Sequence, residues 1–144
     1  MVNPDTIKLL KECNAGIKMG VNSINEVFDN VESDEFRKIL NDSRDEHQRL
    51  GSKTHEMLND YDDEGKEPNP MARSMSWLKT NIKLTVNESD KTIADLMTSG
   101  CDMGVKSLNK YLNEYKAADE VSKDITKKLI NLEERLTVDI RDFL

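Results

Sequence analysis

Residues 16–25, Gly-Ile-Lys-Met-Gly-Val-Asn-Ser-Ile-Asn, occur again as Gly-Cys-Asp-Met-Gly-Val-Lys-Ser-Leu-Asn at residues 100–109. Six of the ten positions are identical, and both copies contain the Gly-x-x-x-Gly spacing. Internal similarity of this kind indicates that one structural unit occurs twice in the chain. Weaker matches follow the two copies, at Ser33–Phe36 with Ala118–Val121 and at Arg49-Leu50 with Arg135-Leu136.

Apolar residues around both copies recur every three or four positions, which is typical of a helix with one buried face. The first helix is expected to start at Asn3-Pro4 and to run to about Asn30, because Asn caps free N–H groups and proline suits the first helical position. Each half of the repeat is predicted to be an αα-hairpin. The other three long helices are expected at Ser33 to Tyr61, about Asp90 to Glu114, and about Asp119 to the end.

A long connection is predicted between the two hairpins. The stretch Asp60–Pro68 is acidic and contains Gly and Pro, so it is expected to be the principal loop. A shorter helix is expected from about Met71 to Val86, with Trp77 anchoring it to the bundle. The predicted domain 1–144 thus has hairpin 1 at 4–60, a crossover at 61–88 and hairpin 2 at 89–144. Such a chain is predicted to be an all-α four-helix bundle of ferritin-like type.

One apolar stripe on each helix is expected to form the core. Leu132→Ala is accordingly expected to cost about 2 to 5 kcal/mol. The repeated glycines are expected to mark where the first and third helices touch, because glycine allows two backbones to approach closely. These glycines are Gly16, Gly20, Gly100 and Gly104. The residues expected to be largely buried are Ile17, Val21, Ile24, Leu50, Leu108, Leu129, Leu132 and Leu136.

Composition excludes several classes of partner. The chain has 144 residues, a formal net charge of −7 and no cluster of Lys and Arg in its sequence, so neither nucleic acid nor an anionic membrane is an expected partner. It has no apolar run of membrane-spanning length and no charged-then-apolar leader, which predicts a cytoplasmic protein. Cys13 and Cys101 lack CxxC spacing and are expected to be reduced, half-buried thiols.

The chain does not supply the residues of a di-iron site. Bundles of that kind use a Glu from each of two helices and a Glu-x-x-His pair from each of the other two. The only histidines here, His47 and His55, both lie on the second helix, with Arg44 and Ser52 three residues before them. No catalytic, cofactor-binding or metal residue is therefore assigned.

A site with a single histidine stays open as an alternative, formed by Glu12, Glu46, His47 and Glu133. The favoured interpretation is a core histidine hydrogen-bonded to Asn14 or Ser43, with the carboxylates on solvated edges.

Three segments carry a resemblance to a known family. They are residues 70–79, Pro-Met-Ala-Arg-Ser-Met-Ser-Trp-Leu-Lys, residues 89–96, Ser-Asp-Lys-Thr-Ile-Ala-Asp-Leu, and Gly100-Cys101-Asp102 with the repeat that follows. Together they resemble a bacterial domain-of-unknown-function family within the ferritin-like superfamily. That family has acidic residues where this chain has Thr98 and Cys101, and only Asp102 keeps the pattern. The resemblance implies a ferritin-like bundle without an assigned activity.

The expected function is that of a non-enzymatic helical bundle acting through protein contacts, as a homodimer or as an accessory protein in stress or in spores. The alternative is a degenerate metal-binding or redox protein of ferritin-like descent. A third class, small-molecule binding near the glycines and the polar positions of the helix faces, has no positive residue signal in the sequence.

Overall fold

The computed structural model describes residues 2–61 and 89–144. Four long helices occupy most of these ranges, and no β-strand occurs in them, which confirms the all-α expectation for this part of the chain. The predicted short helix at 71–86, Trp77 and most of the acidic loop lie outside the described residues. The elements are α1 (Pro4–Phe28), α2 (Asp34–Asp60), α4 (Asp90–Glu114), α5 (Glu120–Ile140) and a short 3-10 helix, η1 (Arg141–Phe143).

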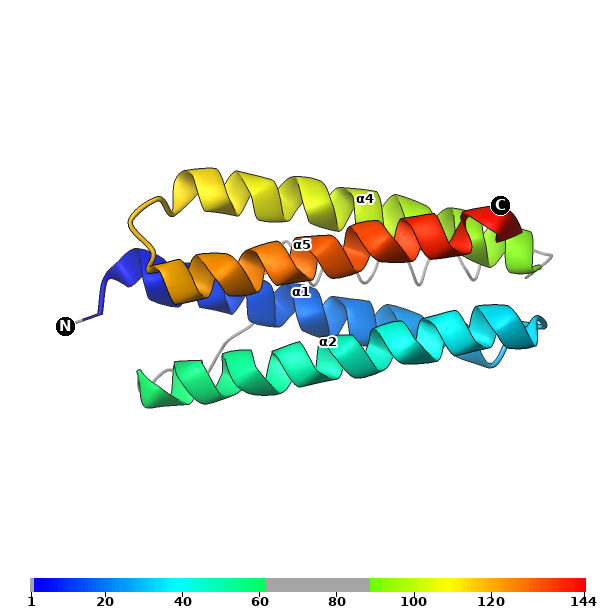
Figure 1. Ribbon diagram of the computed structural model, residues 1–144, viewed down its shortest axis with the longest axis horizontal. Coiled ribbons are helices and arrows are strands. Elements are labelled where there is room, and N and C mark those ends of the chain that lie inside the picture. Colours follow the sequence, from blue (N-terminus) through cyan, green and yellow to red (C-terminus); the bar gives the residue numbers. More distant parts are fainter. Residues whose placement is uncertain (1, 62–88) are drawn as a thin grey trace.

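Two antiparallel hairpins form the bundle (Figure 1). One consists of α1 and α2, the other of α4 and α5, and α5 also packs against both α1 and α2. The chain leaves α2 at the end of the bundle where α1 begins, and α4 begins at the opposite end. Within the described ranges, no helix combines the length and the apolar character needed to cross a bilayer.

Each long helix begins at a side chain that accepts a hydrogen bond from a nearby backbone N–H. Such caps satisfy donors that have no partner inside the helix. The starts predicted at Asn3 and Ser33 are confirmed, and α1 ends at Phe28, two residues before the predicted position. The capping residues are Asn3, Ser33, Ser89 and Asp119.

The first residue of α4 binds the loop of the other hairpin. The Asp90 carboxylate accepts hydrogen bonds from the backbone N–H groups of Glu32, at 2.8 Å, and Ser33, at 2.9 Å. Hydrogen bonds to an ionised acceptor are stronger than neutral ones. Asp90 therefore ties the start of α4 to the loop between α1 and α2.

A matching pair of contacts lies at the other end of the bundle, where α1 begins. The Asp5 carboxylate accepts from the backbone N–H of Ala117 at 3.1 Å, and the Thr6 hydroxyl oxygen accepts from that of Asp119 at 2.9 Å. Each hairpin thus holds the loop of the other, and the two sets of contacts fix the register of the hairpins along the bundle.

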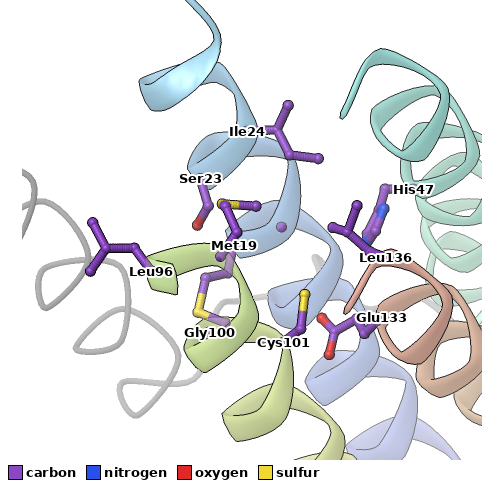
Figure 2. Close-up of a pocket in the computed structure, with 11 residues that line it drawn as sticks. Met19, Ser23, Ile24, His47, Leu96, Gly100, Cys101, Glu133 and Leu136 are labelled. Carbon is purple, nitrogen blue, oxygen red and sulfur yellow. The ribbon is translucent and has the colours of Figure 1, made fainter. Parts of the chain in front are cut away.

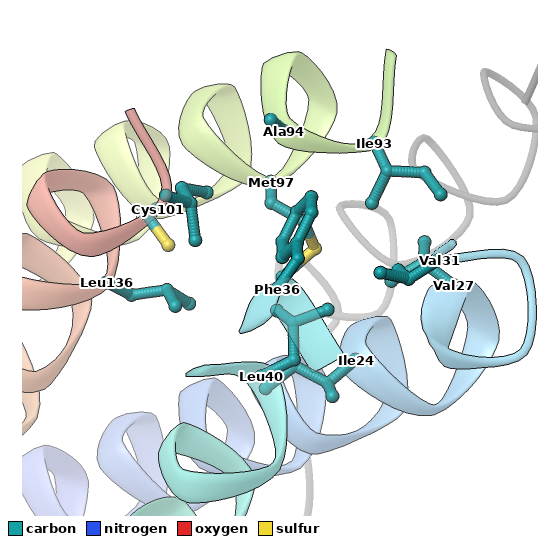
Figure 3. Packing of buried hydrophobic residues seen from close by; sticks show 11 residues of the cluster. Ile24, Val27, Val31, Phe36, Leu40, Ile93, Ala94, Met97, Cys101 and Leu136 are labelled. Carbon is teal, nitrogen blue, oxygen red and sulfur yellow. The ribbon is translucent and has the colours of Figure 1, made fainter. Parts of the chain in front are cut away.

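Most of the expected core residues are buried, but two are not. Six of the eight residues named above are in the core, whereas Val21 and Leu132 are only partly buried. One cluster lies around Phe36 near the loop between α1 and α2 (Figure 3). There η1 adds Phe143, whose ring stacks on that of Phe36 with centroids 4.6 Å apart. A second cluster contains Leu129, which is fully buried.

The burial pattern moves the largest stability effect on α5 from Leu132 to Leu129. Leu129→Ala is expected to lower the free energy of unfolding by about 2 to 5 kcal/mol, because it leaves a cavity in the core. Leu132→Ala should cost clearly less, since that side chain already meets solvent. Urea denaturation of both variants measures the difference. Equal losses would show that Leu132 is buried in solution.

Candidate functional site

A small cavity lies between the four long helices. Its volume is about 40 Å³, and each of the four helices contributes to its wall (Figure 2). Most lining side chains are apolar. Among the described residues that line it, the polar ones are Ser23 of α1, His47 of α2, Cys101 of α4 and Glu133 of α5.

His47 is a buried core histidine held by its own helix. Its Nδ1 lies 2.7 Å from the backbone oxygen of Ser43, one helical turn earlier. A carbonyl oxygen can only accept, so Nδ1 carries the proton and Nε2 is the unprotonated nitrogen of the neutral ring. Burial lowers the pKa of His47, which favours this neutral form. Ser43 was one of the two partners expected for His47.

Glu133 is buried, which corrects the expectation that it lies on a solvated edge. Its side chain reaches from α5 into the cavity, toward Cys101 (Figure 2). Within the described residues, Oε2 has no hydrogen-bond partner. Burial raises the pKa of Glu133 to about 8, so the carboxyl group is mostly protonated at neutral pH. Sequence reasoning missed this because helical spacing placed Glu133 beside the apolar stripe rather than within it.

Gly20 and Gly104 were expected to mark a contact between α1 and α4, but the structure places each of them against the other helix of its own hairpin. A Cβ added to Gly20 would lie 3.0 Å from the imidazole of His47 on α2, and one on Gly104 would overlap the carboxyl group of Glu133 on α5. A Cβ on Gly100 would meet no atom of the described residues within 4 Å. Gly20 and Gly104 therefore make room for a polar side chain from the other helix of their own hairpin.

The four residues of the alternative metal site do not converge. Glu46 forms an ion pair with Arg135 on the surface between α2 and α5. Glu12 shares a hydrogen bond with Tyr111 and does not line the cavity. Only His47 and Glu133 lie in the cavity wall, and no group of three His, Cys, Asp or Glu within residues 2–61 and 89–144 could hold a metal ion.

Both thiols are buried, more deeply than the half-burial expected. Cys13 lies 3.1 Å from the hydroxyl oxygen of Thr126, and burial raises the pKa of Cys13 to about 12. Burial also raises the pKa of Cys101, and the nearby Glu133 adds to this effect. Because the thiolate is the reactive form, neither cysteine is prepared for nucleophilic attack at neutral pH.

The cavity can therefore take a small hydrogen-bonding molecule of about the size of water. A polar space above roughly 10–15 Å³ accommodates one water molecule if it offers two or more partners. The protonated carboxyl group of Glu133 is a donor, and Nε2 of neutral His47 is an acceptor.

A second candidate site is the surface groove between α2 and α5, here called the α2–α5 groove. Its larger part, the basic half, has a volume of about 430 Å³ and is lined by Arg49, Lys53 and Lys128. Its smaller part, the acidic half, has a volume of about 220 Å³ and is lined by Asp42 and Asp139. The two halves share the residues Glu46, Leu132 and Arg135.

Comparison with known proteins gives no family for this chain. No protein-family model matches it, and no curated protein sequence does.

Burial of Glu133 makes stability depend on pH. Its pKa rises from 4.5 to about 8 on folding, so the folded protein holds this proton more tightly than the unfolded chain. The stability that this proton contributes is fully present below pH 4.5 and is lost as the pH rises toward 8. By pH 7 the loss is roughly 3 kcal/mol.

Glu133→Gln removes this titration. The free energy of unfolding of the variant should therefore increase relative to that of the wild type as the pH rises. Urea denaturation across that range measures the gain, with Glu134→Gln, which removes the exposed neighbouring carboxyl group, as the matched control. Parallel stability curves for Glu133→Gln and the wild type would show that Glu133 reaches solvent.

Proposed function

We propose that this chain is a non-enzymatic four-helix bundle of ferritin-like type, built from two repeated hairpins, that acts by contact with another protein. The matching contacts of the two hairpins support the duplication. Gly20 and Gly104 match in the sequence repeat, and each receives a buried polar side chain from the next helix. His47 precedes Arg49 by two residues, as Glu133 precedes Arg135.

The state of the titratable core groups argues for a non-enzymatic role. Catalytic acids and bases need a pKa near the working pH and a path to substrate. Glu133 has such a pKa, but it faces a cavity of only about 40 Å³. The two thiols have raised pKa values and are buried.

The observation that carries the proposal is the α2–α5 groove. Arg49, Lys53 and Lys128 gather there on a chain of net charge −7, and none of them forms an ion pair with another residue of the described ranges. Leu50 and Leu132 lie among them. An apolar centre inside a polar rim is the usual anatomy of a protein interface.

Site-specific photo-crosslinking tests this surface. A photoreactive residue at Asn131, which is exposed in the groove, should give a discrete protein adduct in cells that make the protein. The same residue at Asn109, exposed on α4, is the matched control and should give none. Absence of an adduct at Asn131, or equal adducts at both positions, would contradict a role for this groove.

The second candidate function, metal binding, is favoured only by the position of His47 and Glu133 in one cavity. Protein purified without chelator is expected to carry no stoichiometric iron, manganese or zinc, because Glu12 and Glu46 lie elsewhere. Elemental analysis of the wild type and of His47→Gln decides the question. Stoichiometric metal in the wild type that is lost in His47→Gln would promote this candidate to first place.

A further inference from the structure

We propose that the protein bound at the α2–α5 groove is a second copy of this chain, turned end for end to form a symmetric dimer. This inference rests on the proposed function and names its partner. It follows from the order of charges along the groove, from the geometry of a twofold axis and from the size of the exposed face.

The charges along the groove are sorted by sign. Along α2, Asp42 comes first and is followed by Arg49 and Lys53. Along α5, which runs antiparallel to α2, Lys128 comes first and Asp139 near the end (Figure 1). The acidic residues of both helices therefore lie toward the same end of the bundle, and the basic residues lie toward the other.

A twofold axis that keeps the helices of the two copies aligned can bring such a surface onto itself in two ways. If the axis runs along the helices, the basic half of one copy meets the basic half of the other, and like charges in contact cost several kcal/mol. If the axis crosses both helices at a right angle, each basic half meets the acidic half of the other copy. Only the second arrangement is complementary, and it is an isologous interface in which one patch binds itself.

The twofold axis would pass through the middle of the groove. Leu132 is partly buried and belongs to both halves of the groove, so it would meet Leu132 of the second copy. The ion pair between Glu46 and Arg135 lies in the same shared region. An apolar contact at the centre with charges on either side excludes water where the two copies are closest.

The exposed face is large enough for a specific dimer. A helix of 21 residues, the length of α5, is about 30 Å long, and two helices side by side are about 20 Å wide. The face is thus about 600 Å², which is the lower end of the area that each partner buries in stable complexes.

The cations of the basic half lie on two helices. Arg49 and Lys53 are four residues apart on α2, which is about 6 Å along the helix, and Lys128 lies across the groove on α5. They fit a partner whose negative charges are also spread along a surface. The acidic half provides such charges, with Asp139 in no ion pair of the described chain and Asp42 paired only with the exposed Lys38.

Charge reversal tests the arrangement through two variants that should each fail to dimerise. In the first, Arg49→Glu, Lys53→Glu and Lys128→Glu make both halves acidic. In the second, Asp42→Lys and Asp139→Lys make both halves basic. All five positions are exposed, so both variants should fold, which circular dichroism checks. Sedimentation equilibrium should show a dimeric wild type and, for each variant, a dissociation constant that is at least about 100-fold larger.

Mixing the two variants provides the decisive measurement. An acidic groove and a basic groove attract each other, so the mixture should form a heterodimer although neither variant dimerises alone. Lys106→Glu with Lys110→Glu, both exposed on α4, is the matched control and should leave the wild-type dimer intact. A dimer that survives either set of reversals, or a mixture that stays monomeric, would overturn the end-for-end arrangement.

A wild type that is monomeric at every concentration would contradict the proposed dimer but not the proposed function. In that case the adduct at Asn131 would contain a different protein. If the wild type is monomeric and Asn131 also gives no adduct, the proposed function fails as well.

Discussion

The reciprocal hydrogen bonds between hairpin starts and hairpin loops set the register of the whole bundle. Asp90 holds the loop between α1 and α2, and Asp5 and Thr6 hold the loop between α4 and α5. Packing of apolar stripes alone leaves two hairpins free to slide by a helical turn, because ridges and grooves recur along each helix. Directional bonds at both ends remove that freedom. The cavity and the α2–α5 groove both depend on this register, since each is made by residues from both hairpins.

The interior of the bundle illustrates how a narrow apolar stripe accommodates polar side chains. His47 satisfies one nitrogen with the carbonyl oxygen of Ser43, and Glu133 remains protonated because burial disfavours its charge. Gly20 and Gly104 leave the space that each of these side chains fills. Each glycine costs about 1 kcal/mol in helix propensity, and it allows a long polar group to lie inside four close-packed helices.

The α2–α5 groove shows the opposite solution, in which charges stay solvated and are sorted by sign along the helices. Exposed ion pairs contribute little to stability, so the stability of the fold hardly depends on the order of charges along α2 and α5. Complementary charges do guide association and orientation between molecules. The proposed dimer would give this order of charges a role in recognition.

Local sequence determined the parts of this protein that local physics controls. The spacing of apolar residues predicted four long helices, and Asn3 and Ser33 located two of their starts, because capping involves only neighbouring residues. The repeat located the matching glycines Gly20 and Gly104. It did not reveal which helix each glycine faces.

Only the tertiary structure decided what the helices do to one another. Helical spacing gives the angle of a side chain about its own axis, but burial depends on how neighbouring helices are rotated and shifted. For that reason Leu132 proved to be partly exposed, Glu133 became a buried acid, and Glu46 paired with Arg135 outside the cavity. The α2–α5 groove likewise joins residues more than 70 positions apart, as in the pair Lys53 and Lys128, and no local pattern in the sequence links them.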